Sequence, residues 1–250
     1  MGDEPANRIG WRLRRFATID STNRWVLDEA RSGAAAGLVA VADEQTEGRG
    51  RRGRTWSAPP GSSLLVSVLL RPTLHVEKVH VLTMAAALSL RDAVEDVAGL
   101  RSGLKWPNDL VVGERKLAGL LAEADLESEG HVRAVVIGVG CNIEWAEIPT
   151  ELEGIATACN LEVGHPVDRG RVLDAFLDHL GTRLEQLDRV SAEYREGLVT
   201  LGRKVRVDLG DREVIGTATD VDAAGRLVVV PDAGDAVTVA VGDVVHLRDA

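Results

Sequence analysis

Five short apolar runs of strand character are spread over residues 38–140 of the chain. They are LVAVA (38–42), SLLVSVLL (63–70), LVV (110–112), KLAGLLAE (116–123) and AVVIGVG (134–140). Short runs rich in Val, Leu and Ile between turn residues are typical of buried strands. We therefore expect one sheet whose strands come from the whole length of this region.

Three other segments have the spacing of amphipathic helices. Residues 79–97 are long and rich in Ala and Leu, and residues 21–33 open on a Ser/Thr/Asn cap and close on a glycine. A third helix is expected from about Asp168 to about Val190. Because helices and strands are mixed without strict alternation, we predict an α+β fold, a mixed sheet with helices packed on one side.

The pattern changes after residue 198. From LGRKVRVDLGD onward, short β-type runs alternate with turns at LGDR, DAAGR and DAGD. Gly and Asp at such turns indicate a series of hairpins. We predict two domains, a main domain of residues 1–198 and a small C-terminal β-barrel of residues 199–250.

Composition narrows the classes of protein that the chain can belong to. Its 250 residues are 45% hydrophobic and 27% charged, as in ordinary globular proteins. The formal net charge of −10 argues against a general nucleic-acid binder, because phosphate affinity comes mostly from Lys and Arg. No secretory signal, membrane span or disulfide framework is evident, so we expect a cytoplasmic protein that does not bind membranes.

The segment GRGRRGRTW (48–56), here called the glycine–arginine loop, is a cationic exception in this acidic chain. It matches G-x-G-x-x-G, but two prolines follow where a dinucleotide fold needs a helix, and no acid lies about 20 residues on. The P-loop and the protein-kinase motif set are absent as well. The pattern alone is therefore weak evidence for any of these sites.

The chemistry of this loop is more informative than its pattern. Glycines allow successive N–H groups to converge on an anion, and arginine binds carboxylate or phosphate through two hydrogen bonds. Trp56 offers a flat face to an adenine ring. Such a loop would be mobile when empty and ordered around an anion. The alternative interpretation is a solvated basic loop with a core tryptophan.

A second polar stretch, KWPNDLVVGERKLAGLLAE (105–123), sets charged residues among apolar ones. A turn at PND and another at VGER would let the ammonium groups of Lys105 and Lys116 face one pocket. Such a pair suits a reaction that concentrates phosphate charge, although two surface lysines beside a hairpin are the alternative. In GVGCNI (138–143), Asn142 could reach a metal or a ribose, or could only cap a turn.

STN (21–23), the glycine–arginine loop, KWPNDL, RKLAGLLAE and GVGCNI, in this order, resemble the catalytic core of biotin protein ligases. The resemblance covers most of residues 15–145, and the C-terminal domain, as an SH3-like barrel, fits it too. It implies an enzyme that joins biotin to ATP as biotinyl-5′-AMP, with Mg²⁺, and transfers biotin to a lysine of a carboxylase carrier domain. Only about twenty residues precede STN, too few for the DNA-binding domain of some relatives, so no DNA partner is expected.

The resemblance also implies roles for individual residues. Lys116, bridging the biotin carboxylate and the α-phosphate, and Arg51, retaining the adenylate, would be catalytic. The biotin site would be formed by Ser21, Thr22, Asn23, Gln45, Arg49, Gly50, Arg51, Lys116 and Gly119. The ATP site would be formed by Arg51, Arg54, Trp56, Lys105, Asn108, Asp109 and Asn142. Asn142 would also be the ligand of the metal.

Two other functions stay open on the sequence. A lipoate or octanoate ligase would share the fold and the acyl chemistry. A non-enzymatic RNA-binding module could use the arginines of the loop, although aromatic residues make up only 3% of the chain. The sequence leaves open whether the chain forms a homodimer, and whether the C-terminal domain docks the carrier or completes the ATP site.

Overall fold

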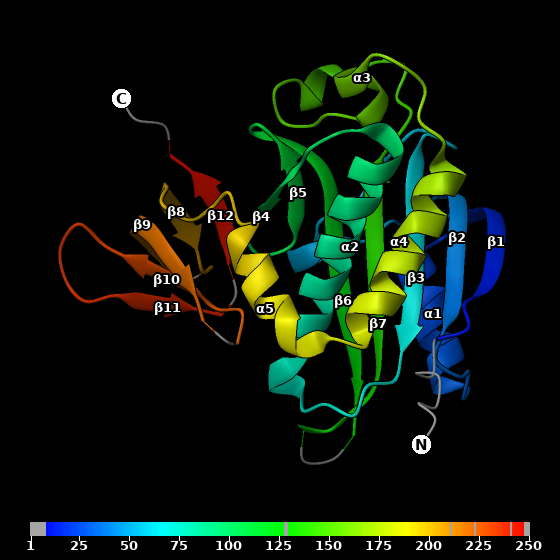
Figure 1. Ribbon diagram of the computed structural model, residues 1–250, viewed down its shortest axis with the longest axis horizontal. Coiled ribbons are helices and arrows are strands. Elements are labelled where there is room, and N and C mark those ends of the chain that lie inside the picture. Colours follow the sequence, from blue (N-terminus) through cyan, green and yellow to red (C-terminus); the bar gives the residue numbers. More distant parts are fainter. Residues whose placement is uncertain (1–8, 128–129, 211, 223, 241, 248–250) are drawn as a thin grey trace, which may run out of the picture.

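The computed structural model describes residues 9–127, 130–210, 212–222, 224–240 and 242–247. Two sheets organise the chain (Figure 1). The strands of the larger sheet are β1 (Arg12–Ile19), β2 (Leu38–Gln45), β3 (Ser63–Leu70), β4 (Gly103–Lys105), β5 (Asp109–Val112), β6 (Arg115–Leu126) and β7 (Val132–Asn142). Their order is β1-β2-β3-β7-β6-β5-β4, with β1 and β2 parallel and the other pairs antiparallel. The predicted mixed sheet is confirmed, and each of the five apolar runs lies in a strand.

The helices cover both faces of the large sheet. They are α1 (Thr22–Arg31), α2 (His80–Ala98), α3 (Cys159–Val163), α4 (Arg169–Leu184) and α5 (Leu187–Glu196). In Figure 1, α2 and α4 lie in front of the strands. Along β2, Val39 and Val41 belong to the large core on the α2 side, whereas Leu38 and Ala40 pack with Val26 of α1. The prediction that helices cover one side was therefore wrong, because alternate residues of the central strands are apolar on both faces.

The third predicted helix is divided. Its first part, α4, begins at Asp168, whose carboxylate accepts hydrogen bonds from the N–H groups of Gly170 and Arg171. At Gln186 the backbone leaves the helical region, with φ −131° and ψ 43°, and α5 follows. Both helices contact α2, so the break allows two segments to pack on one central helix. No helix within the described residues is long and apolar enough to cross a membrane.

The C-terminal region forms a separate antiparallel sheet of order β11-β10-β9-β8-β12. Its strands are β8 (Lys204–Asp208), β9 (Glu213–Val221), β10 (Leu227–Val230), β11 (Val237–Val239) and β12 (Asp243–His246). The predicted domain boundary falls between α5 and β8. The predicted hairpins are present, whereas closure of this sheet into a barrel stays a prediction.

The two sheets are joined by hydrogen bonds near the turn before β5. Trp106 N–H donates to Thr200 Oγ1 at 3.1 Å, and its indole Nε1–H donates to the carbonyl of Gly225 at 2.8 Å. Val199 N–H also donates to the carbonyl of Leu104 at 2.9 Å across the same junction. These contacts hold the C-terminal domain beside the large sheet, and residues of its strand β12 line the candidate site.

Candidate active site

Glycines in β6 and β7 open a cavity of 480 Å³ over the large sheet. On the face that packs on α1, β7 presents Ala134 and Val136 and then Gly138 and Gly140. A Cβ on Gly138 would lie 2.1 Å from Asn23 Oδ1, and one on Gly140 would lie 2.4 Å from a ring carbon of Trp56. Only glycine therefore allows these side chains to lie on the strand.

One end of the cavity is neutral, polar and buried. Ser21 caps α1, with its Oγ accepting from Arg24 N–H, which holds Thr22 at the sheet. The N–H and Oγ1 of Thr22 both donate to Gln45 Oε1, at 2.7 and 2.9 Å. Ser67 Oγ of β3 lies 2.7 Å from Thr22 Oγ1. The amide and hydroxyl groups at this end are thus fixed by one another before a ligand enters.

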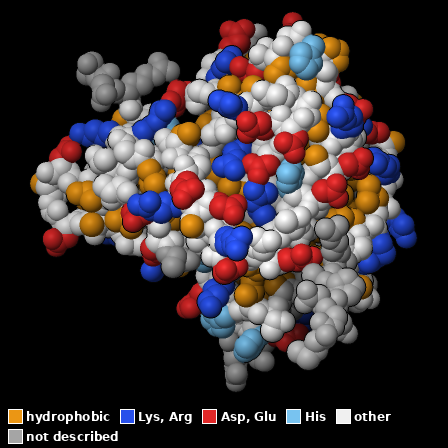
Figure 2. Space-filling model, viewed as in Figure 1, with side chains coloured by type: hydrophobic (Ala, Val, Ile, Leu, Met, Phe, Trp, Pro, Cys, Tyr) orange, Lys and Arg blue, Asp and Glu red, His pale blue; other side chains and the backbone are white. Residues whose placement is uncertain are grey.

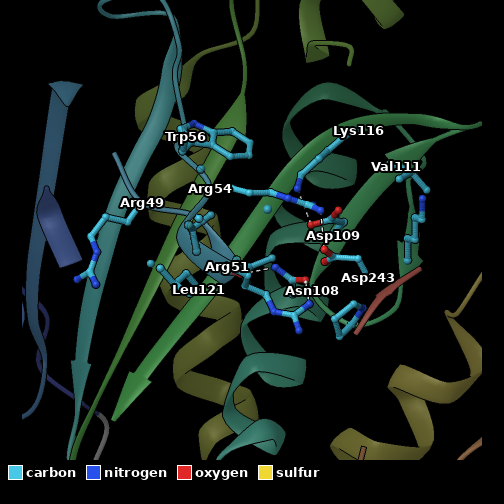
Figure 3. Close-up of a pocket in the computed structure, with 18 of the residues that line it drawn as sticks. Arg49, Arg51, Arg54, Trp56, Asn108, Asp109, Val111, Lys116, Leu121 and Asp243 are labelled. Atoms are coloured by element: carbon cyan, nitrogen blue, oxygen red, sulfur yellow. Dashed lines mark hydrogen bonds and ion pairs between the residues drawn. The ribbon is translucent and has the colours of Figure 1, made fainter. Parts of the chain in front are cut away.

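Asn23 and Arg49 are connected at this end through Glu123 of β6. Asn23 Nδ2 donates to Glu123 Oε2 at 2.9 Å, and Arg49 Nη1 lies 2.9 Å from Glu123 Oε1. Ser67 Oγ lies 2.6 Å from Asn23 Oδ1. In Figure 3 the guanidinium of Arg49 points away from Lys116 and Asp109. Arg49 therefore borders the neutral end instead of joining the other cations.

The glycine–arginine loop is a folded hairpin. Gly50 N–H donates to the carbonyl of Arg54, and Trp56 N–H donates to the carbonyl of Gly48. Arg52 has φ 54°, a left-handed conformation that is uncommon outside glycine. The expectation that its successive N–H groups converge on an anion was wrong for Gly50 and Trp56, because the loop's own carbonyls accept these bonds. A ligand would therefore meet the side chains of the arginines and not these two N–H groups.

Two arginines of the loop are neutralised by the C-terminal domain. Arg54 Nη2 lies 2.5 Å from Asp243 Oδ2, and Arg52 Nη1 lies 3.5 Å from the same oxygen. Arg51 donates to Asn108 Oδ1 at 3.0 Å and to the carbonyl of Gly242 at 3.3 Å. Burial lowers the pKa of Arg51 from its ordinary value. The C-terminal domain thus forms part of the wall at the cationic end.

Lys116 lies at the centre of the cationic end, where Figure 3 shows it facing Asp109. Its Nζ is 2.7 Å from Asp109 Oδ1 across the β5–β6 hairpin and 5.5 Å from the centre of the Trp56 ring. The backbone of Lys116 is held from the other side, since its N–H donates to the carbonyl of Ile155 at 2.7 Å. The ammonium therefore starts from a fixed strand and projects into the cavity.

A second lysine and a histidine line the wall next to the C-terminal domain. Burial lowers the pKa of Lys105 from its usual value. His246 Nδ1 lies 3.2 Å from Glu114 Oε2, and its Nε2 lies 3.2 Å from Thr200 Oγ1. Burial, and then the charge of Lys105, lower the pKa of His246. A group of this kind is neutral near pH 7 and supplies no positive charge to the site.

The structure brings nearly all of the predicted site residues to this cavity. Those lining it are Ser21, Thr22, Asn23, Gln45, Arg49, Gly50, Arg51, Arg54, Trp56, Lys105, Asn108, Asp109, Lys116 and Gly119. Asn142 is not among the lining residues. It is 3% exposed, and its Nδ2 donates to the carbonyl of Thr157 at 2.9 Å. The predicted role of Asn142 as a metal ligand gains no support from this position.

Sequence reasoning missed several residues of the site. Ser67 and Glu123 hold the neutral end, and Asp243, Glu114 and His246 line the cationic end. Ser67 and Glu123 lie in the mainly apolar runs 63–70 and 116–123, where each is one of two polar side chains, and this was the available signal. The residues of β12 lie beyond any local pattern, because they reach the site through the packing of the second domain.

A glycine-floored cavity with a neutral polar end and a cluster of arginines and lysines suits an enzyme that joins an organic acid to a nucleotide. The profile of the biotin/lipoate A/B protein ligase family matches residues 15–142, and that of the biotin protein ligase C-terminal domain matches residues 200–247. The chain therefore belongs to the biotin/lipoate A/B protein ligase family.

Individual relatives agree with this assignment. The chain is 39% identical to biotin–[acetyl-CoA-carboxylase] ligase of Mycobacterium tuberculosis, over 96% of this chain and 91% of the relative. It is 35% identical to the bifunctional ligase/repressor BirA of Bacillus subtilis, over 68% of this chain and about half (52%) of that relative. The structure of a biotin protein ligase from Aquifex aeolicus in complex with biotin and ATP superposes with a TM-score of 0.80, at 27% identity, over 95% of this chain and 99% of that one.

Proposed function

We propose that this enzyme activates biotin with ATP as biotinyl-5′-AMP, releases pyrophosphate, and then transfers biotin to a lysine of a carboxylase carrier domain. The relatives named as biotin–[acetyl-CoA-carboxylase] ligases support the substrate and the carrier. The observation that carries the proposal is that one cavity joins the neutral end at Thr22 to the cationic end at Lys116. A carboxylic acid with a neutral polar head can span these two ends.

The neutral end suits the ureido head of biotin. That head carries one carbonyl and two N–H groups, so it needs both donors and acceptors. Ser21 and Asn23 supply them from buried positions, and Gln45 supplies them from a half-buried position that its bonds to Thr22 hold in place. Because their side chains are already fixed, little conformational entropy is lost when biotin binds.

The cationic end suits the formation of the adenylate. When a carboxylate oxygen of biotin attacks the α-phosphorus, negative charge grows on the phosphate oxygens. Lys116 Nζ would stabilise this charge, and Asp109 holds that ammonium in place at 2.7 Å. Arg51 and Arg54 would balance the charge of the departing pyrophosphate.

Trp56 supports the placement of a nucleotide beside this end. Its Nε1–H is buried and has no hydrogen-bond partner among the described residues. A buried donor without a partner is costly, so a ligand or a water is expected to accept from it. An adenylate lying against the ring over Gly140 would supply a flat base and hydrogen-bond acceptors at the same place.

Mg²⁺ is compatible with the oxygen donors at the cationic end. Asn108 and Asp109 would hold it together with phosphate oxygens and water, as Mg²⁺ sites commonly do. Asp109 is already paired with Lys116, and within the described ranges no three His, Cys, Asp or Glu side chains form a metal cluster. The ion would therefore depend on ATP for most of its ligands. When bound, it would neutralise phosphate charge.

An RNA-binding function is not favoured by the structure. Arg51 and Arg54 line the cavity, and Arg52 pairs with Asp243, so these arginines gather around one enclosed site instead of forming an extended basic surface. On the face drawn in Figure 2, acidic and basic side chains are interleaved. No DNA partner is proposed either, because the formal net charge of the chain is −10. The cytoplasmic location and the homodimer stay predictions.

Transfer to a carrier tests the proposed function directly. The purified protein would be incubated with biotin, ATP, Mg²⁺ and an isolated biotin carrier domain, and the mass of the carrier measured. We expect the carrier to gain one biotinyl group, and a carrier whose acceptor lysine is replaced by arginine to gain none. If the carrier gained a lipoyl or octanoyl group instead when those acids are offered, the substrate would be that acid and not biotin. The fold assignment would be unchanged.

A further inference from the structure

A second cavity, of 630 Å³, adjoins the first on the side of α2. It lies between the start of α2, the turn before β5 and two segments of the C-terminal domain, residues 224–226 and Ala240. The residues that line both cavities are Arg51, Trp106, Pro107, Asn108, Leu120 and Leu121. The two cavities are therefore neighbours across a shared wall, in which Arg51 donates a hydrogen bond to Asn108.

The walls of the second cavity differ from those of the first. They are mainly apolar, with Met84 of α2, Ala122 of β6 and Ala224 of the C-terminal domain among them. The cation of Arg226 is already paired with Asp222 at 2.7 Å. A polyphosphate would thus find fewer available cations here than beside Lys116. An extended apolar stem is better suited to these walls than an anion.

We propose that the second cavity is the entrance through which the acceptor lysine of the carrier domain reaches the adenylate. This inference rests on the proposed function. The first cavity would be filled by the adenylate during transfer, so the lysine needs another approach to the same bond. The second cavity adjoins the first at the wall that holds Arg51 and Asn108, and the four methylene groups of lysine match its apolar walls.

The surroundings of this entrance favour the reactive form of the lysine. Only a neutral amine can attack, and the ordinary pKa of a lysine is about 10.4. Apolar walls and the guanidinium groups of Arg51 and Arg226 disfavour an ammonium, so they lower the pKa of an entering lysine. The carboxylate of Glu77 also lines the cavity and acts in the opposite direction, but its side chain is 84% exposed, so solvent screens its effect. The Nζ lone pair then attacks the carbonyl carbon of the mixed anhydride. A C–N bond forms, the C–O bond to AMP breaks with its electron pair on AMP, and the amine proton passes to water.

Lys116 lines the first cavity but not the second. A substitution that fills the second cavity should therefore slow transfer and leave adenylate formation at Lys116 intact. Thr83→Trp on α2 and Ala240→Trp on the opposite wall would each fill the second cavity. Thr182→Trp, at an exposed position of α4, is the matched control. Each variant would be assayed for biotin-dependent ATP–pyrophosphate exchange and for single-turnover transfer from preformed adenylate to the carrier domain.

We expect both cavity variants to keep exchange within about twofold of wild type, as the control does. Their transfer rates should fall about tenfold or more, since a displaced nucleophile reacts slowly. Unchanged transfer in both would overturn the proposal, and an equal loss of exchange would show that the cavity serves the nucleotide instead. Failure of the proposed function has a different signature, the absence of biotin-dependent exchange in the wild-type protein.

Discussion

The two ends of the first cavity are built by different means. At the neutral end, Thr22, Asn23 and Ser67 are each less than 5% exposed and bond to one another. At the cationic end, the side chain of Arg54 is 68% exposed and pairs with a carboxylate from the second domain. The side chains of the neutral end are thus preorganised by hydrogen bonds, whereas those of the cationic end are held by ion pairs that a phosphate can replace.

This difference follows from the free energy of hydrogen bonds and ion pairs. A buried hydroxyl or amide without a partner costs about 1–3 kcal/mol, so a site of such groups must be complete before the ligand enters. An exposed ion pair is worth only about 0–1 kcal/mol, so its partner can be exchanged at little cost. Ligand recognition and phosphate chemistry are therefore separated along one cavity.

The largest effect is expected at Lys116. Lys116→Ala removes the cation that stabilises the growing charge, and removal of one such group costs about 10²–10³ in rate. Biotin-dependent ATP–pyrophosphate exchange would measure the loss. Lys204→Ala, which removes an exposed ammonium of β8 paired with Asp232, is the control and should keep full exchange. Comparable exchange in the two variants would refute the role of Lys116.

Arg51→Ala should affect retention of the intermediate more than its formation. The variant loses a charge-assisted hydrogen-bond donor at the rim of the cavity, worth about 1.5–3 kcal/mol. We expect release of biotinyl-5′-AMP into solution to rise about ten- to a hundredfold, measured by chromatography in the absence of carrier. Arg31→Ala at the end of α1 is the control. Unchanged release in Arg51→Ala would remove Arg51 from this role.

Ser67→Ala tests whether hydrogen bonds preorganise the side chains of the neutral end. It leaves Thr22 Oγ1 and Asn23 Oδ1 short of a partner, which should lower the free energy of unfolding by about 1–3 kcal/mol. The KM for biotin should rise while the KM for ATP stays constant. Denaturant unfolding and steady-state kinetics would measure both. A rise in the KM for ATP alone would contradict the division of the cavity into two ends.

Asp243→Asn tests the opposite end. Asp243 competes with phosphate for Arg54, so removing its charge should lower the KM for ATP by about two- to fivefold at low salt and by less at high salt. Asp232→Asn, at another exposed carboxylate of the C-terminal domain, is the control. If the KM for ATP rose instead, Asp243 would be a group that positions the loop for ATP.

The smallest effect concerns the pH dependence of stability. The folded-state pKa of His246 lies below its ordinary value of 6.5, because of burial and Lys105; Glu114 and Arg203 also face it. The contribution of neutral His246 to the free energy of unfolding is therefore fully present above pH 6.5, and it is lost as the pH falls below that value. His246→Gln should reduce this decline, measured by thermal melts at several pH values. His165→Gln, at an exposed position, should leave it unchanged.

Much of the fold could be predicted because the pattern is local. Strand β3 is buried at all eight positions and α2 is rich in Ala and Leu, so short windows of sequence identify both. Strand β1, RLRRFATI, was missed because an edge strand with exposed arginines lacks an apolar run. The break at Gln186 was missed because neither Gly nor Pro marks it.

The site was predictable where its residues are close in sequence. Lys105 and Lys116 lie 11 residues apart, so the turns between them alone suggested a shared pocket, and both lysines line the cavity. Glu123 lies 100 residues from Asn23, and Asp243 lies 189 residues from Arg54. Such partners meet only through the tertiary fold, which no local window describes.

Activation of biotin in this cavity is tested most directly by ATP–pyrophosphate exchange by the purified protein with Mg²⁺, comparing biotin, lipoate, octanoate and no acid. We expect exchange with biotin alone, because the neutral end offers fixed donors and acceptors for a ureido head. Exchange with lipoate or octanoate and none with biotin would contradict that reading of the neutral end. The absence of exchange with every acid would contradict the proposed activation of a carboxylate at Lys116.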